Sequence, residues 1–223
     1  MARRKSLAFL DVGQGDCFVA DTKSGAIIFD GGSSSEDQVG RYRILPYMKY
    51  LGYQKIQIAV ISHMDIDHYS GIKELLEMGK IKYLGLPEIP KDATMKKIIG
   101  IAKKRGTTIF YLSRGRQITT KDGSLKVLHP QKNSQMEKNA ASLVMQGKIL
   151  GYRVLLTGDV EKEGEEELLS EELERADILK AAHHGSKNST SNEFLQKVQP
   201  KQTVISCGKQ NRYGHPHLET IHR

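Results

Sequence analysis

The stretch from Gln57 to His68 reads QIAVISHMDIDH, and the rest of the sequence is interpreted outward from it. Its first part is a short run of β-branched and apolar residues, which predicts a buried strand. Its second part places two imidazoles and two carboxylates within six residues: His63, Asp65, Asp67 and His68. Imidazole nitrogen and carboxylate oxygen suit zinc, manganese or iron(II). Helical periodicity follows over 69–78, so the stretch predicts a metal-binding loop between a strand and a helix.

Four other predicted strands also run directly into polar or glycine-rich loops. These loops carry Asp30, Asp159, the pair His183-His184, and His215. In open α/β sheets, ligands bind just beyond the carboxyl ends of strands, so we expect the five loops to converge on one composite site. Asp159 can supply a further carboxylate that bridges two ions, and His183 or His184 can complete a second set of ligands.

The pattern of apolar runs and turn residues predicts two mixed sheets. We predict strands near residues 7–12, 17–21, 26–29, 57–62, 82–86, 107–111, 117–120, 125–128, 142–147, 152–157, 178–182 and 203–207. We predict helices near residues 42–51, 69–78, 94–105, 161–174 and 193–198. Hairpins alternate with strand–helix crossovers in both halves, which indicates an α/β fold of two mixed sheets packed face to face with helices outside. No linker or shift in composition interrupts the chain, so we expect residues 1–223 to form a single domain.

Composition excludes several classes of protein. The 223 residues are 38% hydrophobic and 27% charged, as in a soluble globular protein, and two cysteines, Cys17 and Cys207, exclude a disulfide framework. No run approaches the ~20 apolar residues of a membrane helix. The net charge is +8, but residues 159–177 hold ten acids and two bases, so the remainder carries +16. A basic body favours a polyanionic partner: nucleic acid, an anionic membrane surface or a cell-wall polymer.

A basic stripe is predicted on the helix near residues 94–105. Its members are Lys96, Lys97, Lys103 and Lys104. Their spacing sets them on a different face from the apolar residues of that helix. The stripe is either a solvated surface or a groove for a nucleic-acid backbone.

Several motifs together carry a resemblance to a known family. They are LDVGQGD (10–16), DGG (30–32), SHMDIDHYSG (62–71), NAASLV (139–144), LLTGD (155–159), KAAHHGSK (180–187) and NRYGHP (211–216). In this order they resemble the metallo-β-lactamase superfamily, and more narrowly the C-terminal hydrolase-like domain of the ComEC competence family. The resemblance implies an αββα sandwich with a metal site at the sheet edge. In ComEC proteins the domain follows a membrane channel and has been proposed to degrade the DNA strand that is not imported.

The sequence departs from the superfamily pattern at the first metal site. Asp65 stands where a histidine is usual, and the later histidine of that site has no clear match, because His129 is best interpreted as structural. The segment from Asn139 to Ser142 lies in that region instead. Oxygen ligands favour harder ions, so we expect two divalent ions with Mn²⁺ favoured and Zn²⁺ as the alternative.

The resemblance also implies roles for individual residues. His63 and Asp65 would hold the first ion, Asp67 and His68 the second, and Asp159 would lie between them. His183 is the preferred remaining ligand and His184 would face substrate, or the two exchange roles. The expected catalytic residues are Asp67, which also orients the attacking water, His184, and His215, which contacts the phosphate or protonates the leaving oxygen.

A further group of residues is expected to support the ligands or to contact substrate: Asp30, Asn139, Ser142, Ser186 and Lys187. Asp30 either accepts a hydrogen bond from a ligand histidine or is a turn residue. Ser186 and Lys187 precede a predicted helix, where backbone amides either hold a phosphate or form an ordinary helix start. We interpret Asp11, Gln14 and Asp16, in a glycine-punctuated turn, as structural.

The combined expectation is a divalent-metal-dependent phosphodiesterase acting on DNA, single-stranded DNA above all. The alternatives are an esterase of a cell-wall or small-molecule phosphoester, similar to phosphorylcholine esterases, and a non-catalytic DNA-binding module. We expect a monomer. The boundaries at Met1 and Arg223 resemble those of an excised domain. An excised ComEC-like domain would belong beside its membrane channel at the extracytoplasmic face, whereas a complete chain without a signal would be cytoplasmic.

Overall fold

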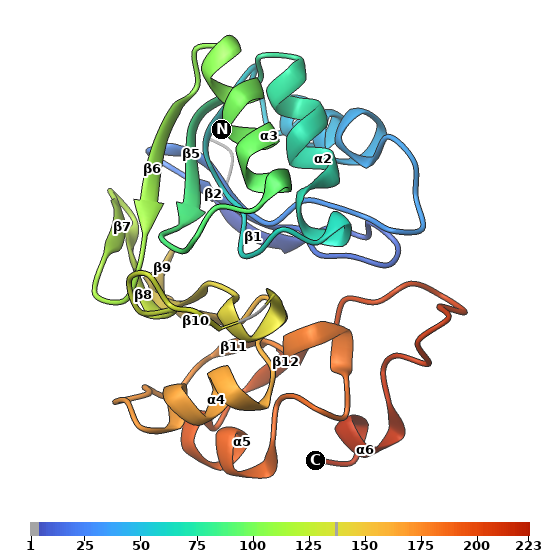
Figure 1. Ribbon diagram of the computed structural model, residues 1–223, viewed down its shortest axis with the longest axis vertical. Coiled ribbons are helices and arrows are strands. Elements are labelled where there is room, and N and C mark those ends of the chain that lie inside the picture. Colours follow the sequence, from blue (N-terminus) through green and yellow to red (C-terminus); the bar gives the residue numbers. More distant parts are fainter. Residues whose placement is uncertain (1–4, 137) are drawn as a thin grey trace.

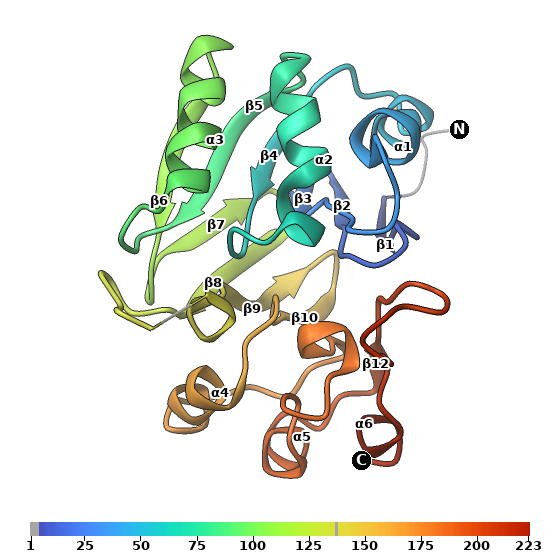
Figure 2. The ribbon, with the colours of Figure 1, turned by 45° about the vertical axis from the view of Figure 1, so that its right-hand side comes forward.

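Two six-stranded sheets pack face to face, with helices on both outer faces (Figure 1). The computed structural model describes residues 5–136 and 138–223. Helices α1, α2 and α3 cover the first sheet, and α4 and α5 cover the second (Figure 2). The predicted αββα sandwich is therefore confirmed.

The first sheet has the order β1-β2-β3-β4-β5-β6. Its strands are β1 (Ser6–Phe9), β2 (Phe18–Thr22), β3 (Gly25–Phe29), β4 (Ile56–Val60), β5 (Ile81–Pro87) and β6 (Thr108–Leu112). The first three strands are antiparallel, and the pairs from β3 to β6 are parallel. The parallel part aligns the carboxyl ends of β3 and β4, where Asp30 and the 62–68 loop follow.

The second sheet has the order β12-β11-β10-β9-β8-β7. Its strands are β7 (Gln117–Thr120), β8 (Gly123–His129), β9 (Val144–Ile149), β10 (Tyr152–Leu156), β11 (Ile178–Lys180) and β12 (Gln202–Val204). The strands β10, β11 and β12 are parallel. Each predicted strand has a counterpart, and β11 and β12 end two to three residues earlier than predicted, because the residues after them leave the ladder to build the site.

The helices match the predicted periodicity with three differences. The helices are α1 (Leu45–Tyr50), preceded by a π-helical segment (Gly40–Ile44), α2 (Ile66–Glu77), α3 (Ala93–Lys104), α4 (Lys162–Leu169), α5 (Asn192–Val198) and α6 (Leu218–Ile221). One difference is that the helix predicted from residue 69 begins at Ile66, so Asp67 and His68 lie in its first turn and not in a loop. Helix α4 ends at Leu169, earlier than predicted, because the Gln146 side chain hydrogen-bonds both the carbonyl and the N–H of Glu174 and holds that segment extended. Helix α6 was not predicted, because four residues are too few to show a period.

The core explains why β3 is apolar throughout. Ile27 and Phe29 pack between the two sheets, whereas Ile28 packs under the helices of the first sheet. Both faces of the strand are covered, so its residues do not alternate between apolar and polar. No helix among the described residues is long and apolar enough to cross a membrane.

Candidate metal centre

Four buried side chains converge at the edge of the sandwich. Donor atoms of Asp16, His68, Asp159 and His184 all lie within 4.8 Å of one another. Asp159 is central: its Oδ2 is 3.1 Å from His68 Nε2 and 3.3 Å from His184 Nε2. Asp67 adds a carboxylate from α2, with its Oδ2 3.4 Å from His184 Nε2. The loops after β4, β10 and β11 thus converge as expected, and the loop between β1 and β2 joins them.

The imidazoles of this site are fixed through one ring nitrogen. His68 Nδ1 lies 2.9 Å from Asp30 Oδ2, and His184 Nδ1 lies 2.8 Å from the carbonyl oxygen of Ser206. His63 Nδ1 contacts Ser62 Oγ at 3.0 Å. Metal-ligating histidines usually have the other ring nitrogen held by a carboxylate or carbonyl in this way. Asp30 is therefore placed as the support of a ligand histidine and also accepts the Ser62 N–H at 2.7 Å.

The opposite nitrogens of these rings fit a divalent ion. The Nε2 atoms of His63, His68 and His184 are buried and make no hydrogen bond. Two of them form ion pairs with Asp159, at 3.1 Å for His68 and 3.3 Å for His184, without a hydrogen bond. Buried polar atoms without partners are costly. The set of imidazole nitrogens and carboxylate oxygens is the one that divalent transition metals accept.

Left-handed backbone conformations set the directions of several side chains of the site. His183 and His184 are consecutive residues with φ of 48° and 53°, and Asp30 has φ of 57°. Such non-glycine residues each cost about 1–3 kcal/mol and cluster at functional sites. The conformation turns His184 inward, toward Asp159, directly after β11.

Two glycines let the backbone cross closely beneath Asp67. A Cβ on Gly32 would lie 2.5 Å from the carbonyl oxygen of Ile66, and one on Gly15 would lie 2.2 Å from that of Gly32. The Asp16 N–H donates to the Asp67 carbonyl at 3.1 Å. This crossing brings Asp16 under the metal-binding loop, where a larger residue at either glycine would separate the two segments.

Sequence reasoning missed the pair formed by Asp16 and Lys180. The Lys180 ammonium contacts Asp16 Oδ2, donates to the Gly158 carbonyl at 3.0 Å and lies 3.5 Å from Asp159 Oδ1. Both members of the pair are buried. A lysine inside the otherwise apolar ILKAA run was the available signal, because a buried lysine needs a carboxylate partner. Asp16, interpreted as a turn residue, is placed among the candidate ligands instead.

The carboxylates control the protonation of the two central histidines. Burial lowers the pKa of His184, but Asp159 and Asp16 outweigh it and raise that pKa to about 10. Burial also opposes the charge on His68, yet Asp159 and Asp30 raise its pKa well above the usual value. Without an ion, both rings are therefore positively charged at neutral pH. Burial raises the pKa of Asp159, and the charges of His68, His184 and Lys180 outweigh this and hold it well below the usual value.

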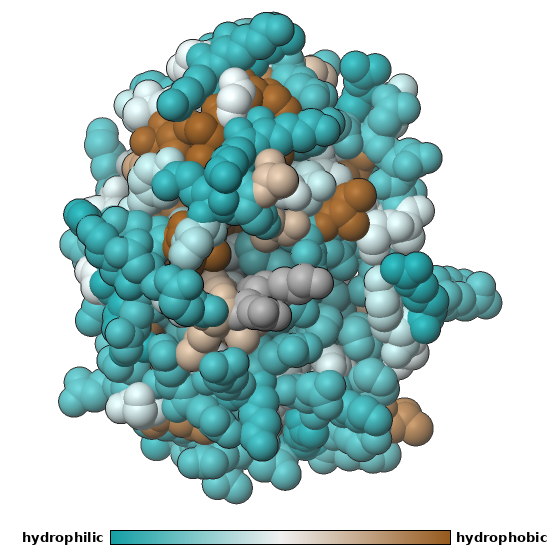
Figure 3. All heavy atoms as spheres, viewed as in Figure 1, coloured by the Kyte–Doolittle hydropathy of each residue, from teal (hydrophilic) through white to brown (hydrophobic). Residues whose placement is uncertain are grey.

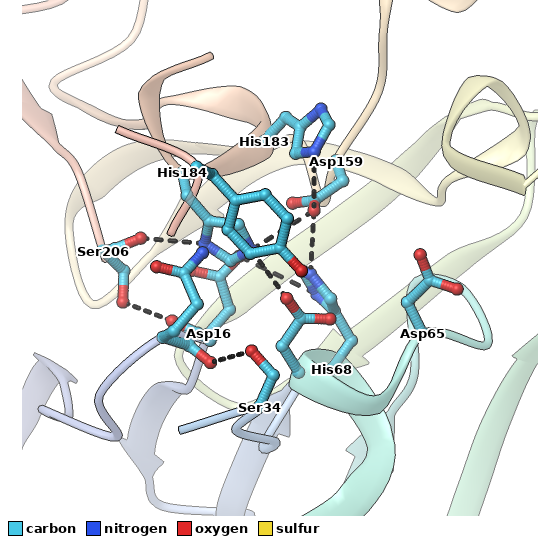
Figure 4. Close-up of polar contacts among 12 residues, drawn as sticks. Asp16, Ser34, Asp65, His68, Asp159, His183, His184 and Ser206 are labelled. Atoms are coloured by element: carbon cyan, nitrogen blue, oxygen red, sulfur yellow. Dashed lines mark hydrogen bonds and ion pairs between the residues drawn. The ribbon is translucent and has the colours of Figure 1, made fainter. Parts of the chain in front are cut away.

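The expected first ion site is looser than the second. His63 Nε2 is 3.8 Å from Asp65 Oδ2, and the Asp65 side chain is 49% exposed. Figure 4 shows Asp65 apart from the cluster around Asp159. Burial and the charge of His68 lower the pKa of His63 well below its usual value, so this ring is neutral and able to ligate. His129 contributes nothing here: it is buried, with Nδ1 3.0 Å from the carbonyl oxygen of Ser142.

The structure reverses the preferred order of His183 and His184. His184 takes the place facing Asp159, whereas His183 Nε2 is 4.0 Å from Asp159 and its Nδ1 lies 2.8 Å from Glu161. The reason is the turn after β11, which sends the two consecutive side chains in different directions. His183 instead lines the cavity in front of the cluster.

That cavity has a volume of about 280 Å³. It is lined by Gln14, Ser34, Asp65, Ile66, Asp67, Asp159, His183, His184, Arg212, Tyr213 and His215. His215 thus lies in the lining of the same cavity as Asp67 and Asp159. Burial and the neighbouring histidines lower the pKa of His215 to about 4, so it is neutral at pH 7. A neutral imidazole suits hydrogen bonding to a phosphate better than donation of a proton to a leaving group.

The remaining expected residues fall into two places. Ser142 is buried and its Oγ accepts the Asp159 N–H at 3.3 Å, so it supports the central carboxylate. Asn139 lines a separate hollow with Asp65 and Glu161. Its Oδ1 is buried without a hydrogen bond.

The expected phosphate site around Ser186 and Lys187 is not available at the start of α5. The amides of Thr190 and Ser191 already donate to the two carboxylate oxygens of Glu165, at 2.6 and 2.9 Å. The Lys187 N–H donates to His217 Nδ1, and Ser186 is buried. A buried carboxylate therefore holds the position that a phosphate would need.

The basic stripe lies away from the cavity. Lys96, Lys97, Lys103 and Lys104 are exposed on α3, over the first sheet. None of them lines the cavity in front of the cluster. Binding of nucleic acid by this stripe stays a prediction.

Comparisons with known proteins identify the family to which the chain belongs. The sequence model of the Metallo-beta-lactamase superfamily matches residues 10–209. ComE operon protein 3 of Bacillus subtilis (strain 168) is 36% identical over 95% of this chain and 29% of its own length. Competence protein ComA of Neisseria gonorrhoeae is 30% identical over 92% of this chain and 27% of its own length. The chain thus spans less than a third of these relatives.

Solved structures share the fold at low identity. YhfI from Bacillus subtilis, a metallo-beta-lactamase fold protein, superposes with a TM-score of 0.61 at 15% identity, covering 94% of this chain and 85% of its own. The short form of human tRNase Z gives a TM-score of 0.55 at 14% identity, covering 92% of each chain. On the match over residues 10–209, the chain belongs to the metallo-β-lactamase superfamily, and within it resembles the competence proteins.

Proposed function

We propose that this chain is a divalent-metal-dependent phosphodiesterase that cleaves DNA, with single-stranded DNA as its substrate. The observation that carries the proposal is the buried set of Nε2 atoms that face the carboxylates around Asp159 without a hydrogen bond, beside an open polar cavity. The similarity to competence proteins supports a DNA substrate. The match to the metallo-β-lactamase superfamily supports a metal-dependent hydrolase as the class of enzyme.

The residues of the site fall into two groups: those that would hold a metal ion and those that would contact the water or the phosphate. Asp67, His68, Asp159, His184 and Asp16 would hold one ion, and His63 with Asp65 would hold a second, weaker one beside Asp159. When bound, a divalent ion lowers the pKa of water to about 7 and offsets the charge of a phosphodiester. Asp67 lines the cavity and orients the attacking water through its carboxylate. His215 donates a hydrogen bond to the phosphate as a neutral imidazole, and His183 faces the same space.

The donor set favours Mn²⁺ over Zn²⁺. Asp16, Asp67 and Asp159 supply oxygen at the tighter position, and Asp65 supplies oxygen where the second histidine of the superfamily's loop is usual. Harder ions accept such oxygen-rich sites more readily than zinc does.

The test is to remove metal by chelation, add each ion back singly, and measure cleavage of single-stranded DNA and of a chromogenic phosphodiester. We expect Mn²⁺ to support the fastest cleavage of both. A cleavage rate that is clearly highest with Zn²⁺ would reject the assignment of Mn²⁺. Turnover of the chromogenic ester without cleavage of DNA would favour a small-molecule phosphoesterase. DNA binding without turnover of either substrate would favour a non-catalytic DNA-binding module.

In the cell, we propose that this activity degrades the strand that is not imported during DNA uptake. The domain would then act beside a membrane channel of the same polypeptide, at the extracytoplasmic face. Its relatives are more than three times as long as the part that this chain matches, which leaves room for such a channel.

A further inference from the structure

The loop from 209 to 216 forms a wall of the cavity that the metal ligands do not explain. Arg212 and Tyr213 lie at its tip and line the cavity together with Asp67, Asp159 and His184. Tyr213 is 44% exposed, and Ile66, which lines the same cavity at the start of α2, is 53% exposed. Both side chains are therefore accessible to a molecule bound in the cavity.

The loop is built to hold this tip in place. The Asn211 side chain makes four hydrogen bonds within the loop: Nδ2 donates to the carbonyls of Gly208 and His215, and Oδ1 accepts the N–H groups of Tyr213 and His215. The loop is also anchored on the segment that carries His184, because the His217 N–H donates to the Gly185 carbonyl at 3.0 Å. The tip is therefore positioned by the same segment as the metal centre.

The chemistry of the tip matches a nucleotide. The Tyr213 ring is stacked on His215, with centroids 5.6 Å apart and an interplanar angle of 24°. The Arg212 guanidinium covers Tyr213 at 4.9 Å and donates to its hydroxyl at 2.7 Å. Aromatic faces stack on bases, and guanidinium groups bind phosphates. An exposed guanidinium is held only weakly on a tyrosine, so a base can replace it and release Arg212 toward the backbone.

We propose that Arg212 and Tyr213 form a nucleotide subsite beside the metal centre, in which Tyr213 stacks on a base and Arg212 contacts a phosphate of single-stranded DNA. The subsite rests on the proposed function, because it identifies the substrate of the same cavity. Ile66 supplies an apolar contact for the base from another part of the cavity lining. Because stacking is indifferent to base identity, the subsite selects unpaired nucleotides without selecting sequence.

Binding measured without metal separates the subsite from the cleavage reaction. The affinity of the protein for two DNA strands of twelve nucleotides is measured in EDTA by fluorescence anisotropy. One strand is oligothymidylate, and the other is an abasic strand with the same number of phosphates. Tyr213→Ala is expected to weaken oligothymidylate about 5- to 100-fold and to leave the abasic strand unchanged. Tyr213→Phe should restore the affinity, because it keeps the ring. Arg212→Gln should weaken binding of both strands alike. It should also reduce the slope of log affinity against log salt concentration by about one, the amount expected for one lost phosphate contact.

A matched control is Tyr152→Ala, which removes a 51% exposed tyrosine at the far end of β10 from Asp159. It should change neither affinity. Equal losses for both strands with Tyr213→Ala, or no loss with either, would overturn the subsite, even if Mn²⁺-dependent cleavage is found. Base-dependent binding without any metal-dependent cleavage would keep the subsite and overturn the phosphodiesterase.

Discussion

His68 links the core of the fold to the chemistry of the site within a single side chain. Its Nδ1 is held by the fully buried Asp30 after β3, and its Nε2 faces Asp159 after β10. The two carboxylates come from different sheets, so the ring spans the sandwich at its edge. In the metal-free protein the charge on His68 and His184 offsets the carboxylates, and a divalent ion takes over that role.

The first prediction concerns protons released on metal binding. The pKa of His184 is about 10 and that of His68 is well above its usual value in the metal-free protein. Both rings must lose a proton before Nε2 can bind an ion, so Mn²⁺ binding at pH 7 should release one to two protons and strengthen as pH rises. Calorimetric titration in buffers of different ionisation enthalpy measures this release. Binding heats that are the same in every buffer would contradict the protonated state.

The second prediction concerns Lys180. In Lys180→Met the buried carboxylates of Asp16 and Asp159 lose their shared ammonium, so the metal-free protein should lose about 3–5 kcal/mol of unfolding free energy. Mn²⁺ should recover part of this loss by supplying a cation. The matched control is Lys201→Met, which breaks an ion pair with Asp177 from a lysine that is 72% exposed and should change little. Chemical denaturation with and without EDTA compares them, and equal effects at the two lysines would argue against the buried pair.

At the scale of elements, the regular structure was predictable from sequence and the convergence of side chains only partly so. The strands were found because β-branched runs between turn residues are local signals, as in β3 and β10. The side-chain directions of His183 and His184 depend on a left-handed backbone conformation, which no local sequence pattern predicts for these residues. The contact of Asp16 with Lys180 joins residues far apart in sequence. The occupation of the α5 start by Glu165 likewise depends on how α4 packs.

The third prediction tests the close backbone crossing. Gly32→Ala should destabilise the protein and weaken metal binding, because the new Cβ would meet the Ile66 carbonyl at 2.5 Å and push the start of α2 away from Asp16. Gly100→Ala is the control: it lies within α3 with open space around its Cβ position, so it should stabilise by about 0.5–1 kcal/mol. Thermal melting compares the two variants. A Gly32→Ala protein as stable as the wild type would contradict the crossing.

At the scale of the whole molecule, one acidic segment stands out against a surface that is otherwise net positive. The face in Figure 3 is mostly hydrophilic, with hydrophobic residues showing mainly over the layer that contains α3. The acidic residues of 159–177 belong to α4 and its flanks, on the second sheet, whereas the stripe of four lysines lies on α3, over the first. A long polyanion that enters the cavity would therefore be repelled by the acidic segment around α4 and attracted by the lysine stripe on α3.

The fourth prediction follows from that separation. DNA binding should fall steeply with salt, because neutralised phosphates release counterions. Changing Lys96, Lys97, Lys103 and Lys104 together to Gln should flatten this dependence while leaving the cavity intact. Affinity measured over a range of salt concentrations gives the slope. An unchanged slope would show that the stripe is only a solvated face of α3.

The most direct test of the central claim is the rate of Mn²⁺-dependent cleavage of single-stranded DNA by Asp159→Asn. Asp159 faces His68, His184 and Lys180 at once, so loss of its charge should weaken every ion position of the cluster. We predict a fall of about 10⁴-fold or more, as when a core catalytic group is removed. Asp177→Asn, an acid outside the cluster, should stay near wild type. A folded Asp159→Asn protein that binds DNA and cleaves it near the wild-type rate would contradict the metal-dependent mechanism.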